Sequence, residues 1–196
     1  MPNWCDNSIA FYSNDVGGTV LLEALHADIQ KYADSKDSWV GNWLESNRIN
    51  PASVPCRGSF ISCELYSDHV IVAIESAWAP LDELYEEIAK KYDLNYVYIA
   101  EESGCEVYIN TDTTGRFFST RFILNYFELD YLELDSEMLL TYGERLKELS
   151  EETRYYDSFD EVLDDFKEFD FIANSIEDLN LFLEKFNLKI YEYSSE

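Results

Sequence analysis

The sequence predicts an α+β fold with an antiparallel sheet, and three observations lead to this prediction. Strand-like and helix-like hydrophobic periods alternate along the first 100 residues. Hydrophobic residues make up 46% of the 196-residue chain and aromatic residues 16%, so the chain has enough apolar material for a core. After residue 126 the acidic charge becomes denser and the pattern turns mainly helical.

The first strand is expected over residues 3–12, where Ile9 and Phe11 lie on one face. Two glycines at 17 and 18 end this pattern. Thr19 is then expected to cap a helix that runs to about residue 33, with apolar residues at helical spacing. The following stretch, residues 34–57, holds Trp39 and Trp43 and is too aromatic for a plain linker. We therefore expect it to pack onto the same domain.

The middle of the chain predicts a hairpin, a helix and another strand. Strands are expected over residues 59–66 and 69–77, joined by a tight turn, and a helix over 81–92 begins after Pro80. A strand over 95–100 completes the order βαββαβ, which is the ferredoxin-like arrangement. Strands over 105–111 and 116–126 would extend the sheet by a further hairpin. The first domain therefore spans residues 1–125.

The second region, residues 126–196, is acidic and mainly helical. It contains 21 Asp and Glu residues against 6 Lys and Arg. A helix is expected over 136–150, followed by two shorter helices that begin alike. These open with Ser158 and Ser175 as N-caps, each followed by acidic residues in the first turn. Residues 188–193 are expected to form a closing strand.

Net charge is the outstanding compositional feature. The chain has 40 Asp and Glu residues against 14 Lys and Arg, for a formal net charge of −26. A field this negative repels phosphate backbones and anionic membranes, so we expect no direct nucleic-acid or membrane binding. The four cysteines lack CxxC spacing, and neither a signal-peptide pattern nor a long apolar run is evident. These features lead us to expect a cytoplasmic protein with reduced thiols.

Two short motifs resemble a known family. The opening Met1-Pro2-Asn3-Trp4-Cys5, with Asn7, and the segment Ser76-Ala77-Trp78-Ala79-Pro80 are similar to the YubB-like family of uncharacterised phage and plasmid proteins. The resemblance covers roughly residues 1–110 and departs from the family at Leu81, where a second proline is common. It implies a ferredoxin-like domain and a mobile-element origin. It supplies no catalytic residues and does not extend to the acidic region.

Candidate chemistry is sparse. The four tryptophans, Trp4, Trp39, Trp43 and Trp78, are expected in packing rather than around a ligand. Base stacking on sheet aromatics (Phe60, Tyr66, Tyr96 and Tyr98) is disfavoured, because few basic residues accompany them. Carboxylate pairs such as Glu86-Glu87 are typical of solvated helix faces, and His26 and His69 have no nucleophile nearby in sequence. We therefore expect no enzymatic activity, no cofactor and no metal.

The charge excess favours a protein that binds a basic partner. Net charges of about 2–8 suffice for the solubility of a small domain, and self-repulsion lowers stability. Regularly spaced carboxylates can imitate the negative charge of nucleic acid. We therefore expect a phage or mobile-element protein that inhibits a basic nucleic-acid-handling host defence protein, such as a CRISPR effector or restriction enzyme. The expected contact residues are Asp157, Asp160, Glu161, Asp164, Asp165, Glu177 and Asp178.

Alternatives remain open at this point. The charge can reflect adaptation to high salt or a generally acidic proteome, or it can serve solubility only. In that case the chain would be a small-ligand or structural accessory module, and a pocket beside Trp4 and Trp78 would be its sign. Under the inhibitor hypothesis, reversing four of the seven acidic residues to Lys abolishes binding.

Overall fold

The computed structural model describes residues 3–15, 17–33, 35–126, 136–149, 152–169, 171–186 and 188–195. It has a mixed α+β architecture with one five-stranded and one three-stranded antiparallel sheet. The chain forms two compact units. The first comprises Met1–Phe118 with Ser195–Glu196, and the second comprises Ser119–Ser194.

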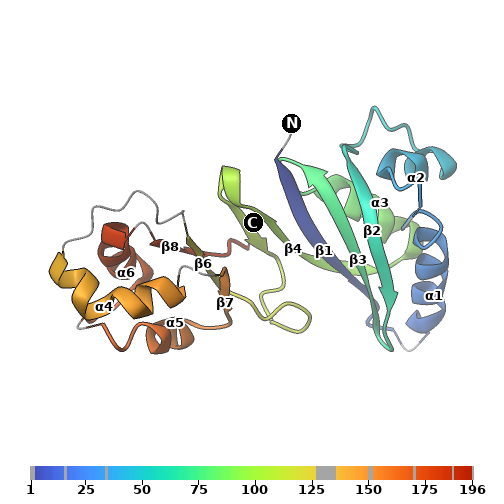
Figure 1. The fold of residues 1–196 in the computed structure, drawn as a ribbon. Coiled ribbons are helices and arrows are strands. Elements are labelled where there is room, and N and C mark those ends of the chain that lie inside the picture. The colour runs from blue at the N-terminus through green and yellow to red at the C-terminus, as the bar shows by residue number, and fades with distance from the viewer. Residues whose placement is uncertain are drawn as a thin grey trace. The chain divides into compact units, whose positions relative to one another are not determined.

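The first unit is built on a five-stranded sheet with strand order β2-β3-β1-β4-β5 (Figure 1). Every neighbouring pair of strands in it is antiparallel. Its elements, in chain order, are β1 (Trp4–Tyr12), α1 (Gly18–Ile29), α2 (Val40–Ser46), β2 (Gly58–Leu65), β3 (His69–Ala77), α3 (Asp82–Tyr92), β4 (Asn95–Glu102) and β5 (Val107–Asn110). The strand–helix–strand–strand–helix–strand order expected from the sequence is present, with α2 as an additional helix between α1 and β2.

The helices α1, α2 and α3 lie together on one face of this sheet (Figure 1). Apolar side chains between the two layers form the core, with Ile9 and Phe11 of β1 fully buried beneath Leu25 of α1 and Leu84 of α3. Trp43 of α2 is also fully buried in this core. The prediction that residues 34–57 pack onto the domain is therefore confirmed.

Asp28 connects the three helices of this layer. Its carboxylate accepts hydrogen bonds from Trp43 Nε1 at 3.0 Å, Lys91 Nζ at 2.9 Å and the Tyr92 hydroxyl at 2.6 Å. Burial alone would raise the pKa of Asp28, but the hydrogen bonds from Tyr92, Lys91 and Lys31 outweigh it and hold that pKa well below its ordinary value. The carboxylate therefore stays charged and holds α1, α2 and α3 together.

The start of α1 differs from the expectation. The helix begins at Gly18, with Gly17 at the N-cap position and no side-chain cap hydrogen bond, so Thr19 lies inside the first turn. A β-carbon on Gly18 would lie 2.2 Å from the β-carbon of Ser13. The chain therefore needs glycine at position 18, where it turns from β1 into the helix.

The segment between the two units also differs from the expectation. The expected hairpin of strands over 105–111 and 116–126 is wrong, because β6 (Phe122–Tyr126) pairs with β7 (Arg154–Tyr156) and β8 (Leu188–Glu192) in the other sheet. Residues 111–118 instead form a loop around Asp112. Its carboxylate accepts hydrogen bonds from the Phe117 N–H at 2.6 Å, the Phe118 N–H at 3.1 Å and the Thr114 hydroxyl at 2.7 Å. These bonds turn the chain away from β5.

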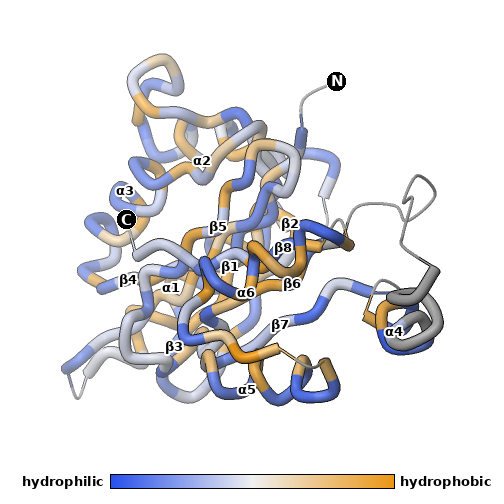
Figure 2. The backbone as a smooth tube through the Cα atoms, turned by 90° about the vertical axis from the view of Figure 1, so that its left-hand side faces the viewer, coloured by the Kyte–Doolittle hydropathy of each residue, from blue (hydrophilic) through white to orange (hydrophobic). Residues whose placement is uncertain are grey.

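The described residues of the second unit form a three-stranded sheet of order β7-β6-β8 and three α-helices. Its elements are β6 (Phe122–Tyr126), α4 (Ser136–Leu149), β7 (Arg154–Tyr156), α5 (Phe159–Asp165), α6 (Ile176–Leu183) and β8 (Leu188–Glu192). Leu124, Leu149, Val162, Leu183 and Phe186 are fully buried in its core. The helices and the closing strand expected here are confirmed, and β7 is an addition. Along α5 hydrophilic and hydrophobic residues alternate, consistent with one buried helix face (Figure 2).

Among the described residues, no helix has both the length and the apolar character needed to cross a membrane.

Candidate functional site

The seven acidic residues predicted as a contact surface all lie at or near two helices of the second unit. Asp157 precedes α5, and Asp160, Glu161, Asp164 and Asp165 belong to it. Glu177 and Asp178 lie in the first turn of α6. The structure gives these seven carboxylates different surroundings, and only some of them are available to a partner.

Glu161 and Asp178 hold the starts of their helices. In α5 the Glu161 N–H donates to Ser158 Oγ at 3.3 Å, and Glu161 Oε2 accepts from the Asp157 N–H at 2.9 Å. In α6 the Asp178 N–H donates to Ser175 Oγ at 3.2 Å, and Asp178 Oδ2 accepts from the Asn174 N–H at 3.3 Å. In each helix the serine hydroxyl satisfies one N–H group that the helix start leaves without a partner, and the acidic side chain binds the N–H of the residue before the cap. Both carboxylates therefore have a structural task.

Glu177 also takes part in the first turn of α6. Hydrogen bonds from its own backbone N–H and from the Ser175 hydroxyl hold the pKa of Glu177 below its ordinary value. The side chain is exposed, so its charge still faces solvent.

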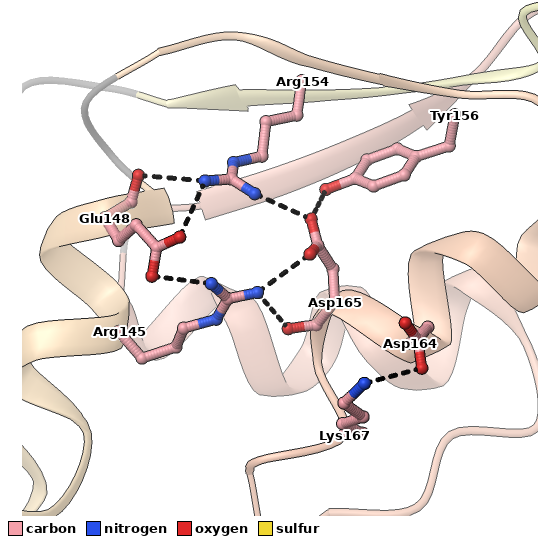
Figure 3. Close-up of polar contacts among 7 residues, drawn as sticks. All are labelled: Arg145, Glu148, Arg154, Tyr156, Asp164, Asp165 and Lys167. Atoms are coloured by element: carbon pink, nitrogen blue, oxygen red, sulfur yellow. Dashed lines mark hydrogen bonds and ion pairs between the residues drawn. The ribbon is translucent and has the colours of Figure 1, made fainter.

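Asp165 is the centre of an ion-pair network that joins α4, α5 and β7 (Figure 3). Its carboxylate accepts from Arg145 Nη2 at 2.8 Å, Arg154 Nη1 at 3.1 Å and the Tyr156 hydroxyl at 2.8 Å. The Glu148 carboxylate pairs with both guanidinium groups. Its Oε2 lies 2.7 Å from Arg145 Nη1, and its Oε1 lies 3.5 Å from Arg154 Nη2. The side chain of Asp165 is 23% exposed, so its charge is neutralised largely within the protein. Asp165 is therefore part of the scaffold.

Asp157, Asp160 and Asp164 remain as exposed carboxylates with little structural engagement. Within the described parts of the chain, the side chains of Asp157 and Asp160 make no hydrogen bond or ion pair. Asp164 pairs with Lys167 at 2.9 Å, but both side chains are more than 60% exposed, and such pairs contribute little to stability. Together with the exposed Glu177, these three residues are the part of the predicted surface that is free to meet a partner. We call Asp157, Asp160 and Asp164 the α5 carboxylates.

The two motifs singled out in the sequence lie side by side in the first unit. Trp4 pairs with Ala77 across β1 and β3, and the Trp78 N–H donates to the Asn3 carbonyl at 3.0 Å. The buried Asn7 amide donates to Ser76 Oγ at 2.8 Å. Trp78 has a φ of 76°, a left-handed conformation that is costly for a tryptophan. This corner is therefore held by contacts between segments that lie 69 or more residues apart in the sequence.

The tryptophans differ in exposure. Trp43 is buried as packing predicts, whereas Trp4, Trp39 and Trp78 are 52%, 42% and 45% exposed. Most of the aromatic residues considered for base stacking are not available to a base. Phe60 and Tyr98 are buried in the core beneath the helices, and Tyr96 packs against the same core. Of that set, Tyr66 is exposed, in the turn after β2.

The cysteines and the possible metal ligands give little support to a nucleophilic or a metal site. Burial raises the pKa of Cys5 to about 11 and that of Cys63 to about 12, which disfavours the reactive thiolate form. Where the structure describes side chains, no group of three His, Cys, Asp or Glu residues is arranged to hold a metal ion.

Sequence patterns could not have separated the seven carboxylates completely. The Ser-x-x-Glu and Ser-x-x-Asp spacings do signal the roles of Glu161 and Asp178. The role of Asp165 depends on Arg154 and Arg145, which lie 11 and 20 residues away and are brought close only by packing. Comparison of the chain with protein-family models and with curated proteins gives no match.

Proposed function

We propose that this protein is a non-enzymatic binding protein that attaches through acidic surfaces to a basic nucleic-acid-handling protein and occupies its nucleic-acid site. Inhibition of a host defence enzyme, such as a CRISPR effector or a restriction enzyme, is the activity that this binding would serve. The similarity of the Asn3-Trp4-Cys5 region to the YubB-like family is the reason for placing it on a phage or plasmid.

We also propose that the first unit is a ferredoxin-like domain. Its first four strands follow the order β2-β3-β1-β4 with antiparallel neighbours, and its helices lie on one face. Crossovers through α1 and α3 place non-consecutive strands together, as expected for two interleaved βαβ units. The addition of β5 at the β4 edge extends this arrangement.

The observation that carries the proposed function is the set of α5 carboxylates. Asp157, Asp160 and Asp164 are exposed and contribute little to the fold, in a chain whose net charge is −26. Such an excess of like charge lowers stability through self-repulsion, and binding to a basic partner would offset this cost. Asp160 and Asp164 are four residues apart, which corresponds to about 6 Å along the helix axis. Spaced charges of this kind can occupy phosphate sites on a basic surface.

An open hollow in the second unit favours the alternative of a small-ligand module. The hollow measures about 460 Å³ and is lined by Phe171, Ile172, Leu181 and Phe182, among others. Ile172 is 86% exposed and Leu181 65% exposed, which is unusual for large apolar side chains. The sign expected for this alternative was a pocket beside Trp4 and Trp78, and this hollow lies in the other unit.

The experiment that tests the proposed function is affinity capture from bacterial lysate with washes of rising salt. The wild-type protein is compared with the variant D157N/D160N/D164N, which leaves Glu161, Asp165 and Asp178 in place. A control variant, E23Q/E83Q/E86Q, removes three exposed carboxylates from α1 and α3.

The proposed function predicts capture of a basic nucleic-acid-binding protein, release by salt, and competition by DNA or RNA. Capture should weaken in the α5 variant and persist in the control variant. A partner that is indifferent to salt and to nucleic acid contradicts the proposal.

A further inference from the structure

The five-stranded sheet has a second face, opposite to the helices. Side chains alternate along β1, so Cys5, Asn7, Ile9 and Phe11 point toward the helices and are buried. The alternate residues of β1, including Trp4, Asp6 and Ser8, therefore belong to the second face. We call this side the open face.

One end of the open face is covered by the loop that follows β5. The Phe117 ring lies 5.1 Å from the Tyr12 ring and 4.9 Å from the His69 ring, measured between centroids. Tyr12 and His69 are directly paired at the end of β1 and the start of β3. Arg116 continues this cover, with an ion pair to Asp68 at 2.8 Å. The loop therefore seals the Tyr12 end of the face.

The opposite end carries a row of carboxylates across three strands. Asp6 of β1 is directly paired with Glu75 of β3 on one side and with Glu101 of β4 on the other. Directly opposite residues in an antiparallel sheet have β-carbons about 4.5–5.5 Å apart, and like charges at such positions are destabilising. Asp6 and Glu75 are exposed, and in the described part of the chain neither side chain makes a hydrogen bond or ion pair. Asp6 and Glu75 therefore leave negative charge uncompensated on the sheet.

Trp4 lies beside this row. It is two residues before Asp6 on the same strand, which places the two side chains about 7 Å apart on the same face. Its cross-strand partner is Ala77, a small residue, and the Trp4 side chain is 52% exposed. An aromatic ring that remains open next to two uncompensated carboxylates has the composition of a site for a cation.

We propose that this end of the open face, formed by Trp4, Asp6 and Glu75, is a docking surface for an arginine side chain of a basic protein partner. This inference rests on the proposed function, because it names a second contact with the same class of partner. The planar guanidinium can stack on the indole of Trp4 while its N–H groups donate to the carboxylates of Asp6 and Glu75. It would also remove the repulsion between the paired carboxylates.

Charge complementarity selects this occupant over other ligands. A nucleic-acid strand can also stack on an exposed aromatic, but its phosphates would meet Asp6, Glu75 and Glu101. A lysine ammonium can neutralise the carboxylates, but it lacks the planar group that stacks on an indole. The carboxylate row also lies outside any arrangement of three ligands suited to a metal in the described residues. Arginine alone uses both the ring and the carboxylates.

The test uses the full chain, labelled with ¹⁵N, and a capped peptide with two arginines separated by glycine. The chain has four tryptophans, so four indole N–H signals are expected. The signal that is missing in the Trp4→Phe variant belongs to Trp4. Titration is repeated with the corresponding lysine peptide and with a short single-stranded RNA. A variant D6N/E75Q is compared with E83Q/E86Q, which removes the same charge from α3 on the opposite side of the sheet.

The proposal predicts that the arginine peptide shifts the Trp4 indole signal and leaves that of the buried Trp43 in place. Binding should weaken about three- to tenfold in D6N/E75Q and less than about twofold in E83Q/E86Q. D6N/E75Q should also have a higher unfolding midpoint, because like charges are removed, which shows that lost binding is not lost folding.

Three outcomes overturn the inference. If the peptide binds without moving the Trp4 signal, and the two charge variants bind it equally, the contact lies elsewhere and the proposed function stands. If the RNA shifts the Trp4 signal and the peptide does not, the face binds nucleic acid. If no basic peptide binds at all, the inference fails, and the affinity capture decides the proposed function separately.

Discussion

At the scale of single residues, the adjacent carboxylates Asp164 and Asp165 have different tasks. Asp165 neutralises Arg145 and Arg154 and accepts from Tyr156, whereas Asp164 pairs with an exposed lysine (Figure 3). Asp165→Asn removes the charge between two partly buried guanidinium groups. We expect it to lower the free energy of unfolding by about 1–3 kcal/mol. Urea denaturation followed by far-UV circular dichroism measures this loss.

The matched control for this prediction is Asp164→Asn. It removes the same charge one residue away and should change the free energy of unfolding by less than about 0.5 kcal/mol. Circular dichroism is the appropriate signal, because all four tryptophans lie in the first unit and their fluorescence does not report the second. Equal losses in both variants would show that Asp165 contributes only surface charge.

The ionisation of Asp112 should make the stability of the first unit depend on pH. Burial opposes ionisation of Asp112, but hydrogen bonds from Phe117, Thr114 and Phe118 outweigh it and lower its pKa to about 2. A lowered pKa in the folded state means that the stabilisation is complete above the unfolded pKa of about 3.9 and is lost as the pH falls. Asp112→Asn should therefore be less stable than wild type at pH 7. The difference should shrink between about pH 4 and about pH 2.

Tryptophan fluorescence during urea denaturation measures this difference, since the first unit contains every tryptophan. Comparing wild type with the variant at each pH cancels the titration of the other carboxylates. A stability difference that stays constant down to about pH 2 would show that the Asp112 charge has no part in holding the loop.

At the scale of elements, the two short helices of the second unit depend on their N-caps. The Ser158 and Ser175 hydroxyls accept from the N–H groups of Glu161 and Asp178. Ser158→Ala and Ser175→Ala should each lower the free energy of unfolding by about 1 kcal/mol, measured by far-UV circular dichroism in urea. Glu161→Gln keeps an acceptor for the Asp157 N–H and should cost less than Glu161→Ala. If the two Glu161 variants are equal, the charge matters and the cap does not.

Several elements could be predicted from the sequence because local chemistry determines them. Serine followed by acidic residues marks the starts of α5 and α6, and alternation marks β1 and β3. The turn between β2 and β3 follows from the short polar stretch around Ser67. Local signals of this kind are independent of what the rest of the chain does.

Other features depend on contacts between distant residues. Phe122–Tyr126 is strand-like in sequence, but only its pairing with residues 154–156 and 188–192 assigns it to the second sheet. β7 is three residues long and too short for a periodic signal. The carboxylate row appears only when the register of β1 with β3 and β4 is known, because Asp6, Glu75 and Glu101 are far apart in the chain. The candidate site was therefore only partly predictable.

At the scale of the whole molecule, the net charge of −26 predicts that salt stabilises the fold. Raising the ionic strength from about 0.01 M to about 1 M shortens the Debye length from about 30 Å to about 3 Å. Self-repulsion is screened, so the urea midpoint should rise with sodium chloride. The D6N/E75Q variant should gain less, because one repulsive pair is already absent. A midpoint that falls with salt would show that attractive ion pairs dominate.

The central claim is that the acidic surface replaces nucleic acid on a basic partner. The most direct measurement is an equilibrium competition in which the captured partner is bound to labelled duplex DNA or RNA and this protein is titrated in. The account predicts that the labelled nucleic acid is fully released, and that release requires more of the D157N/D160N/D164N variant than of wild type. A stable complex containing the partner, the nucleic acid and this protein together would contradict it.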